Sequence, residues 1–130
     1  MNSYWIKTNT VIKKIFSNYI WDIPNTEKTV YLTFDDGPTP EITQWILSQL
    51  KKYDAKATFF CVGNNIEKHP HVLTKILQEG NSIGNHTFNH LNGWKTGAKD
   101  YIENVKLCQE AILKHVEITD IKSSVFRPPY

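Results

Sequence analysis

Two adjacent carboxylates, Asp35 and Asp36, are the first residues along the chain whose types and spacing suggest chemistry. They follow the β-rich run Val30–Phe34 and precede the turn-forming pair Gly37-Pro38. A turn alone could account for them, because Asp and Gly are common turn residues. In the functional interpretation the two side chains point in different directions, so that one carboxylate binds a metal ion and the other accepts a proton.

Two histidines four residues apart, His86 and His90, form the second candidate group. If this segment begins a helical turn, both side chains lie on one face and can share a metal ion. A chance pair of solvated histidines is the alternative. A zinc-peptidase helix would have Glu directly after the first His, and Thr87 in that place argues against it. The remaining histidines lack comparable partners and are expected at the surface: His69, His71 and His115.

The third group is Arg127-Pro128-Pro129-Tyr130. A double proline fixes the backbone as it leaves a strand, which would hold a nearby main-chain donor in place. Arg127 is a permanent cation that can pair with a carboxylate and keep it ionised. An ordinary strand exit with a surface arginine would look the same.

The elements that must position these groups alternate between strand-like and helix-like runs. Strands are expected at 30–34, 57–62, 81–85 and 124–126, and helices after Thr39-Pro40, after Pro70 and over about 102–116. This alternation predicts an α/β fold with parallel strands, in an open doubly wound sheet or in a barrel. Each polar group then follows the C-terminal end of a strand, where such folds place their active sites.

The apolar faces of these helices follow from their periodicity. Gly80 is expected to cap the second helix. The predicted faces are Ile42, Trp45, Ile46, Leu50 and Tyr53 for the first helix, Val72, Leu73, Ile76 and Leu77 for the second, and Ile102, Val105, Cys108, Ile112 and Val116 for the third.

Composition excludes some functions and leaves others open. The formal net charge of +2 comes without any run of basic residues, so no nucleic-acid partner is expected. Cys61 and Cys108 are predicted to be buried free thiols. No secretory signal and no apolar run long enough to span a bilayer are found, so a cytoplasmic location is the default expectation. The oligomeric state is not predicted.

Residues 1–28 form a lead-in with an amphipathic stripe flanked by lysines: Val11, Ile12, Ile15, Phe16, Tyr19 and Ile20. Such a helix could lie on a membrane surface. The favoured interpretation is a helix packed on the outside of the following domain, because surface helices of soluble domains have the same pattern.

Together the three motifs resemble the polysaccharide deacetylase family, also called the NodB-homology domain or carbohydrate esterase family four. Thr33-Phe34-Asp35-Asp36-Gly37-Pro38 is similar to its first motif, His86-Thr87-Phe88-Asn89-His90 to its second and Arg127-Pro128-Pro129-Tyr130 to its third. The connecting segments Ala57-Thr58-Phe59-Phe60 and Gly80–Asn85 also resemble the family. The resemblance covers residues 29–130 and implies the N-terminal part of a distorted (β/α) barrel.

The resemblance also implies roles for the candidate residues. Asp36, His86 and His90 would bind a divalent ion, usually zinc, and Asp35 would be the general base. Arg127 would hold Asp35 ionised, and the backbone N–H of Tyr130 would stabilise the oxyanion of the tetrahedral intermediate. The expected activity is hydrolysis of N-acetyl groups on an amino-sugar polymer such as peptidoglycan or chitin.

The sequence departs from the family after Tyr130, where a motif that supports the arginine and a Leu-x-His motif that supplies the general acid would follow. We therefore expect a domain truncated after its third motif, and a fragment that is inactive by itself. Two alternatives stay open: an O-acetyl esterase acting on xylan, and an inactive metal-binding fragment.

Overall fold

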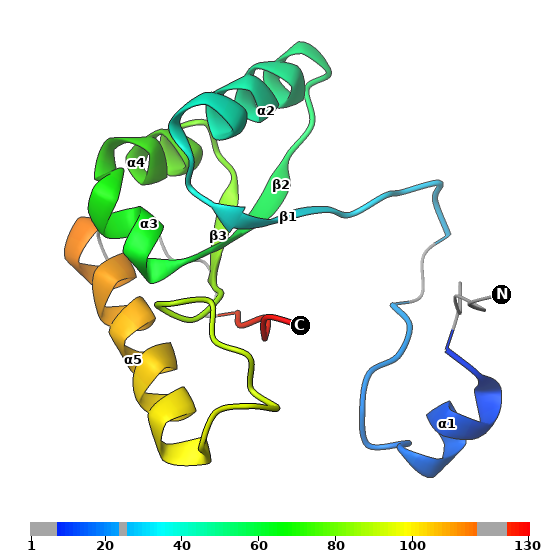
Figure 1. Cartoon of the computed structure of the whole chain (residues 1–130). Coiled ribbons are helices and arrows are strands. Elements are labelled where there is room, and N and C mark those ends of the chain that lie inside the picture. Colours follow the sequence, from blue (N-terminus) through cyan, green and yellow to red (C-terminus); the bar gives the residue numbers. More distant parts are fainter. Residues whose placement is uncertain (1–7, 24–25, 117–124) are drawn as a thin grey trace, which may run out of the picture. The chain divides into compact units, whose positions relative to one another are not determined.

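The computed structural model describes residues 8–23, 26–116 and 125–130 (Figure 1). The chain divides into two compact units, residues 1–30 and residues 31–130, which we describe separately.

A parallel sheet forms the centre of the second unit (Figure 1). It contains β1 (Leu32–Gly37), β2 (Ala57–Cys61) and β3 (Ser82–Asn85) in that order. This confirms the predicted parallel α/β architecture. Of the fourth strand expected at 124–126, the structure has one parallel bridge, between Phe126 and Asn85. Ser124 lies outside the described residues. The first strand was placed too early, because it runs through both aspartates instead of ending at Phe34.

Four helices accompany the sheet: α2 (Pro40–Lys52), α3 (Gly63–Lys68), α4 (Pro70–Gln78) and α5 (Ala98–His115). The short helix α3 was not predicted, because Gly63 and two asparagines suggested only a turn. The α4 face was correct in Val72, Leu73 and Ile76, and Gly80 has the positive φ of 76° expected after its end.

The predicted face of α2 was largely wrong. Ile42 and Trp45 are 65% and 64% exposed, and the buried stripe is Thr43, Leu47 and Leu50. This stripe has helical spacing but begins with a polar residue. The Thr43 hydroxyl accepts a hydrogen bond from the Thr39 backbone N–H at 2.9 Å, so its burial leaves the oxygen satisfied.

The predicted face of α5 was correct in Cys108, Ile112 and Val116, which are buried, but it did not include a buried polar residue. Ile102 is 55% exposed, whereas Asn104 is buried in line with Cys108, Ala111 and Ile112. Cys61 and Cys108 are buried free thiols, as predicted, and the Cys108 thiol donates to the Cys61 carbonyl at 3.4 Å. Burial raises the pKa of Cys61 and raises the pKa of Cys108 to about 11.

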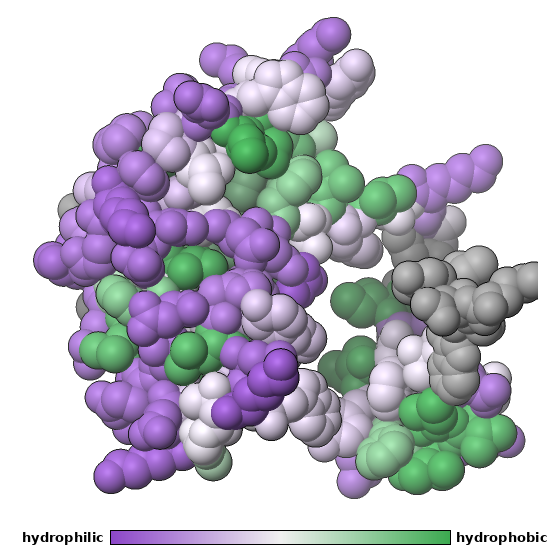
Figure 2. Space-filling model, viewed as in Figure 1, coloured by the Kyte–Doolittle hydropathy of each residue, from purple (hydrophilic) through white to green (hydrophobic). Residues whose placement is uncertain are grey.

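The first unit contains the helix α1 (Thr10–Ile15), which is shorter than the predicted stripe. Asn9 caps it by accepting from the Val11 N–H at 2.8 Å. None of its residues is buried, and hydrophobic side chains of this unit lie on its surface (Figure 2). Its predicted packing on the second unit stays a prediction. Among the described helices, none has the length and apolar character needed to cross a bilayer.

Candidate metal centre and the carboxylate beside it

The three sequence motifs meet at the carboxyl edge of the parallel sheet. Asp35 and Asp36 lie in the last half of β1, His86 follows β3 directly, and Arg127 follows the Phe126 bridge. The register places Asp35 opposite Phe60, while Asp36 is the additional residue in an irregularity between Asp35 and Gly37.

This irregularity turns Asp36 away from the regular strand. Its φ is 68°, a left-handed conformation that Asp tolerates better than most residues. The Asn65 side-chain amide donates to the Asp36 carbonyl at 2.8 Å and holds the backbone there. The turn-like sequence predicted that the side chains of Asp35 and Asp36 point in different directions. This bulge is the structural reason.

Asp36, His86 and His90 converge. The Nε2 atoms of His90 and His86 lie 3.0 Å and 3.4 Å from Asp36 Oδ1, and one potential ligand atom from each of the three residues lies within 4.8 Å of the others. Four-coordinate zinc with bonds of about 2.0–2.2 Å separates its ligand atoms by about 3.3–3.6 Å. Two imidazoles and one carboxylate are donors that zinc accepts, so the residues present fit a divalent ion.

The two histidines do not share a helical face, and that part of the prediction was wrong. Residues 86–90 form a loop in which Thr87 and His90 have φ values of 62° and 54°. The imidazole rings approach each other with centroids 5.1 Å apart. The Asn85 side chain accepts from the Thr87 N–H at 2.9 Å, and this bond fixes the start of the loop.

A second asparagine, Asn104 on α5, holds the middle of the same loop. Its side-chain oxygen accepts from the backbone N–H groups of Phe88 and Asn89, both at 2.9 Å. Asn85 in turn donates to the Val105 carbonyl at 2.8 Å. Sequence reasoning missed both asparagines. An asparagine in the middle of a helix's apolar stripe was the available signal.

The orientation of His86 follows from its second nitrogen. His86 Nδ1 lies 2.7 Å from the Arg127 carbonyl oxygen, which can only accept, so Nδ1 carries the hydrogen. Nε2, the other ring nitrogen, then faces Asp36. His86 is 3% exposed, so this orientation is held within the fold.

Arg127 contacts Asp35, as the predicted pairing of the arginine with a carboxylate requires. Its Nη1 lies 2.8 Å from Asp35 Oδ1 and 2.9 Å from Thr33 Oγ1. The guanidinium carbon lies 4.1 Å from the centroid of the Phe60 ring, within cation–π range. Thr33 and Phe60 therefore fix the arginine from two strands, and neither was predicted as part of the site.

Tyr130 lies beside the cluster. Its ring centroid is 5.1 Å from that of His90, and the side chain is 78% exposed. The proposed use of its backbone N–H stays a prediction. Of the other histidines, His71 is exposed as expected, but the Nε2 atom of His115 is buried.

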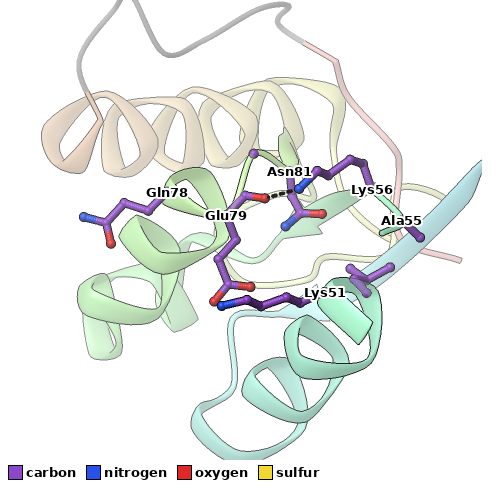
Figure 3. Close-up of a pocket in the computed structure, with 8 residues that line it drawn as sticks. Lys51, Ala55, Lys56, Gln78, Glu79 and Asn81 are labelled. Atoms are coloured by element: carbon purple, nitrogen blue, oxygen red, sulfur yellow. Dashed lines mark hydrogen bonds between the residues drawn. The ribbon is translucent and has the colours of Figure 1, made fainter. Parts of the chain in front are cut away.

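The opposite edge of the sheet carries a separate cavity of about 400 Å³ (Figure 3). It is bordered by charged side chains of Lys51, Lys56 and Glu79, and Lys56 Nζ donates to the Glu79 carbonyl at 2.7 Å. It shares no residue with the group of Asp36, His86 and His90.

The parallel α/β fold and the group of Asp36, His86 and His90 at its carboxyl edge are consistent with the comparison to known families. Residues 22–130 match the polysaccharide deacetylase family, and the chain belongs to that family. Its parallel strands are accordingly part of the family's distorted (β/α) barrel. The match begins before the predicted domain start at residue 29, and the compact unit begins at Tyr31, so the boundary stays a prediction.

Individual relatives are peptidoglycan deacetylases. The chain is 48% identical over 71 residues to a peptidoglycan-N-acetylglucosamine deacetylase of Bacillus cereus, covering 55% of this chain and 33% of the relative. It is 39% identical over 107 residues to the peptidoglycan-N-acetylmuramic acid deacetylase PdaC of Bacillus subtilis, covering 82% of this chain and 22% of PdaC. The solved structure of PdaC matches with a TM-score of 0.73 at 35% identity, over 83% of this chain and 52% of that one. The chain thus spans a third or less of these two relatives.

Proposed function

We propose that the protein is a metal-dependent hydrolase that removes N-acetyl groups from an amino-sugar polysaccharide such as peptidoglycan or chitin. The observation that carries this proposal is the convergence of Asp36, His86 and His90 beside the Asp35–Arg127 pair. Asp36, His86 and His90 can hold a cation, and the neighbouring Asp35 carboxylate is not one of these ligands, so it can act as a base.

The residues divide the work as follows. A divalent ion such as zinc, when bound by Asp36, His86 and His90, supplies the Lewis acidity that activates water and polarises an acetyl carbonyl. Asp35 accepts the proton of the attacking water, and Arg127 orients the Asp35 carboxylate through its bond at 2.8 Å. The backbone N–H of Tyr130 donates to the oxyanion.

The substrate class rests on the relatives. The named activities of the B. cereus and B. subtilis relatives are deacetylation of N-acetylglucosamine and N-acetylmuramic acid residues in peptidoglycan. The same chemistry would cleave O-acetyl groups, and xylan deacetylation is the alternative that an experiment must separate.

Acetate release tests the proposal. The purified protein, stripped with a chelator and reloaded with zinc, should release acetate from an N-acetylglucosamine oligomer faster than from acetylated xylan. His90→Ala should lose at least about a hundredfold in rate, whereas the exposed His71→Ala should not. Release that is independent of metal, or unchanged in His90→Ala, would refute the metal mechanism. Faster release from xylan would select the O-esterase.

A further inference from the structure

The two histidines of the candidate metal site are held by different means. His86 is 3% exposed, and its ring is fixed through Nδ1 by the Arg127 carbonyl at 2.7 Å. The His90 side chain is 32% exposed, and within the part of the chain that the structure describes no group hydrogen-bonds to its Nδ1. Histidines that bind metals are usually oriented by such a bond. The position of His90 therefore depends on the backbone of residues 87–90, which we call the histidine loop.

Helix α3 binds the carbonyl groups of the histidine loop. The Gly63 N–H donates to the Thr87 carbonyl at 3.0 Å. The Asn64 N–H donates to the Phe88 carbonyl at 2.9 Å. Gly63 permits this close approach, because a Cβ there would lie 2.3 Å from the Phe88 ring and 3.0 Å from the Phe88 Cα. The N–H groups of the loop still need acceptors from another element.

Asn104 on α5 supplies these acceptors. Its side-chain oxygen accepts from the N–H groups of Phe88 and Asn89, both at 2.9 Å. The Phe88 N–H has a second acceptor, the Asn104 backbone carbonyl at 3.1 Å, whereas the Asn89 N–H has only the Asn104 side chain among the described residues. Asn104 is 6% exposed, so water has little access to replace this bond. The Asn89 N–H therefore loses its partner when the Asn104 side chain is removed.

The backbone conformation of the histidine loop needs this support. Thr87 and His90 have φ values of 62° and 54°, in the left-handed region that is unfavourable for residues with a side chain. The cost is greatest for a β-branched residue such as Thr87, whose hydroxyl accepts from the Leu91 N–H at 3.1 Å. A loop released from these bonds would relax, and His90 Nε2 would leave its place 3.0 Å from Asp36 Oδ1.

We propose that Asn104 is a positioning residue for His90 and holds the histidine loop in its metal-binding conformation before any ion is bound. The inference rests on the proposed function, from which it takes the metal site, and it adds the residue that prepares one of the ligands. A ligand that is already in its binding conformation loses less conformational entropy when the ion arrives, so the affinity is higher. Removal of a residue that supports a metal ligand typically weakens metal binding about 10–100-fold.

Zinc affinity and amide hydrogen exchange test this proposal without substrate. Competition with a chromophoric chelator should give a Kd for zinc about 10–100-fold higher in Asn104→Ala. Asn104→Asp keeps an acceptor oxygen at this position and should bind zinc within about threefold of the unaltered protein. In metal-free Asn104→Ala the Asn89 N–H should exchange at least about tenfold faster, whereas the Phe88 N–H, which keeps its backbone acceptor, should change less.

Ile112→Ala is the matched control for a loss of stability. Ile112 is buried about two helical turns further along the same face of α5, and its side chain forms no hydrogen bond. This variant should have a lower Tm but the same Kd for zinc at a temperature where the protein is folded. If Asn104→Ala does not fold, Asn104→Ser replaces it in the comparison, because the serine hydroxyl reaches less far from the helix than the asparagine oxygen.

The outcomes separate the two proposals. A lower Tm in Asn104→Ala with an unchanged Kd for zinc would mean that Asn104 only supports the fold, which overturns the positioning role and leaves the deacetylase proposal standing. A Kd that stays raised in Asn104→Asp also overturns the positioning role. The expected changes in Kd and exchange, without acetate release from the zinc-loaded unaltered protein, support the positioning role and refute the deacetylase.

Discussion

Replacing His86 by alanine tests the metal site through stability, with no substrate involved. The side chain is 3% exposed, and its Nε2 is one of three donor atoms grouped within 4.8 Å. A ligand that binds only the folded state stabilises it by about 2.7 kcal/mol at a hundred times its Kd. For a domain of this size about 4–8 °C corresponds to 1 kcal/mol, so zinc at that level should raise Tm by about 10–20 °C.

The loss of one donor sets the expected change. Zinc sites with four ligands contribute about 10–16 kcal/mol, or about 3–4 kcal/mol for each ligand if divided evenly. This corresponds to a Kd about 10²–10³-fold higher in His86→Ala. At the same zinc concentration the remaining stabilisation is about 0.4 kcal/mol or less, and the rise in Tm is under about 3 °C.

The assay is thermal unfolding of chelator-stripped protein with and without zinc. The metal-free melt of His86→Ala reports separately the loss of the buried ring and of its bond to the Arg127 carbonyl. His71→Ala, which removes an exposed histidine, should keep the full zinc shift. A zinc shift in His86→Ala equal to that of the unaltered protein would remove His86 from the metal site.

Three further predictions follow from other contacts. Asp35→Asn should keep the rise in Tm with zinc but lose about a hundredfold or more in turnover. Asp36→Asn should lose the rise in Tm with zinc. The reverse pattern would exchange the roles of the two carboxylates. Gly84→Ala should lower stability by about 1–3 kcal/mol in chemical denaturation, because its Cβ would lie 2.7 Å from the Phe60 ring. Burial raises the pKa of Cys108 from 9.0 to about 11, so at pH 8 this thiol should react with a thiol reagent about a hundredfold more slowly in the folded protein than in denaturant. Because the unfolded chain loses the proton at a lower pH than the folded protein does, the free energy of unfolding should fall as pH rises above 9. Fast labelling of the folded protein would contradict this prediction.

The strand and helix patterns predicted the parallel α/β fold, and the family resemblance named Asp36, His86 and His90, the three residues that converge in the structure. Predicted strands that stop just before Asp35 and just before His86 place Asp36 and His86 at the carboxyl edge of one parallel sheet, where the structure also has them. The helical face proposed for the two histidines was not needed. A loop with positive φ at Thr87 and His90 brings the rings together instead.

The residues that support the cluster were harder to predict, since their roles depend on tertiary contacts. Asn104 is a polar residue on the buried face of α5, and hydrophobic periodicity therefore left it out. The same periodicity predicted that Ile102, which is exposed, is buried. The buried face of α2 was missed for the same reason, because Thr43 is satisfied by a local hydrogen bond that hydrophobic patterning does not register.

The contact between Phe60 and Gly84 connects core packing to Arg127, the partner of Asp35. Phe60 lies on β2, opposite Asp35 in register, and a side chain at Gly84 would press on one part of its ring. The Arg127 guanidinium lies 4.1 Å from the centroid of the same ring. Displacement of Phe60 would therefore shift the arginine that orients Asp35, while Asp36 and the histidines are held by Asn65, Asn85 and Asn104. Mutations at this contact should thus impair turnover more than zinc binding, which distinguishes them from general unfolding.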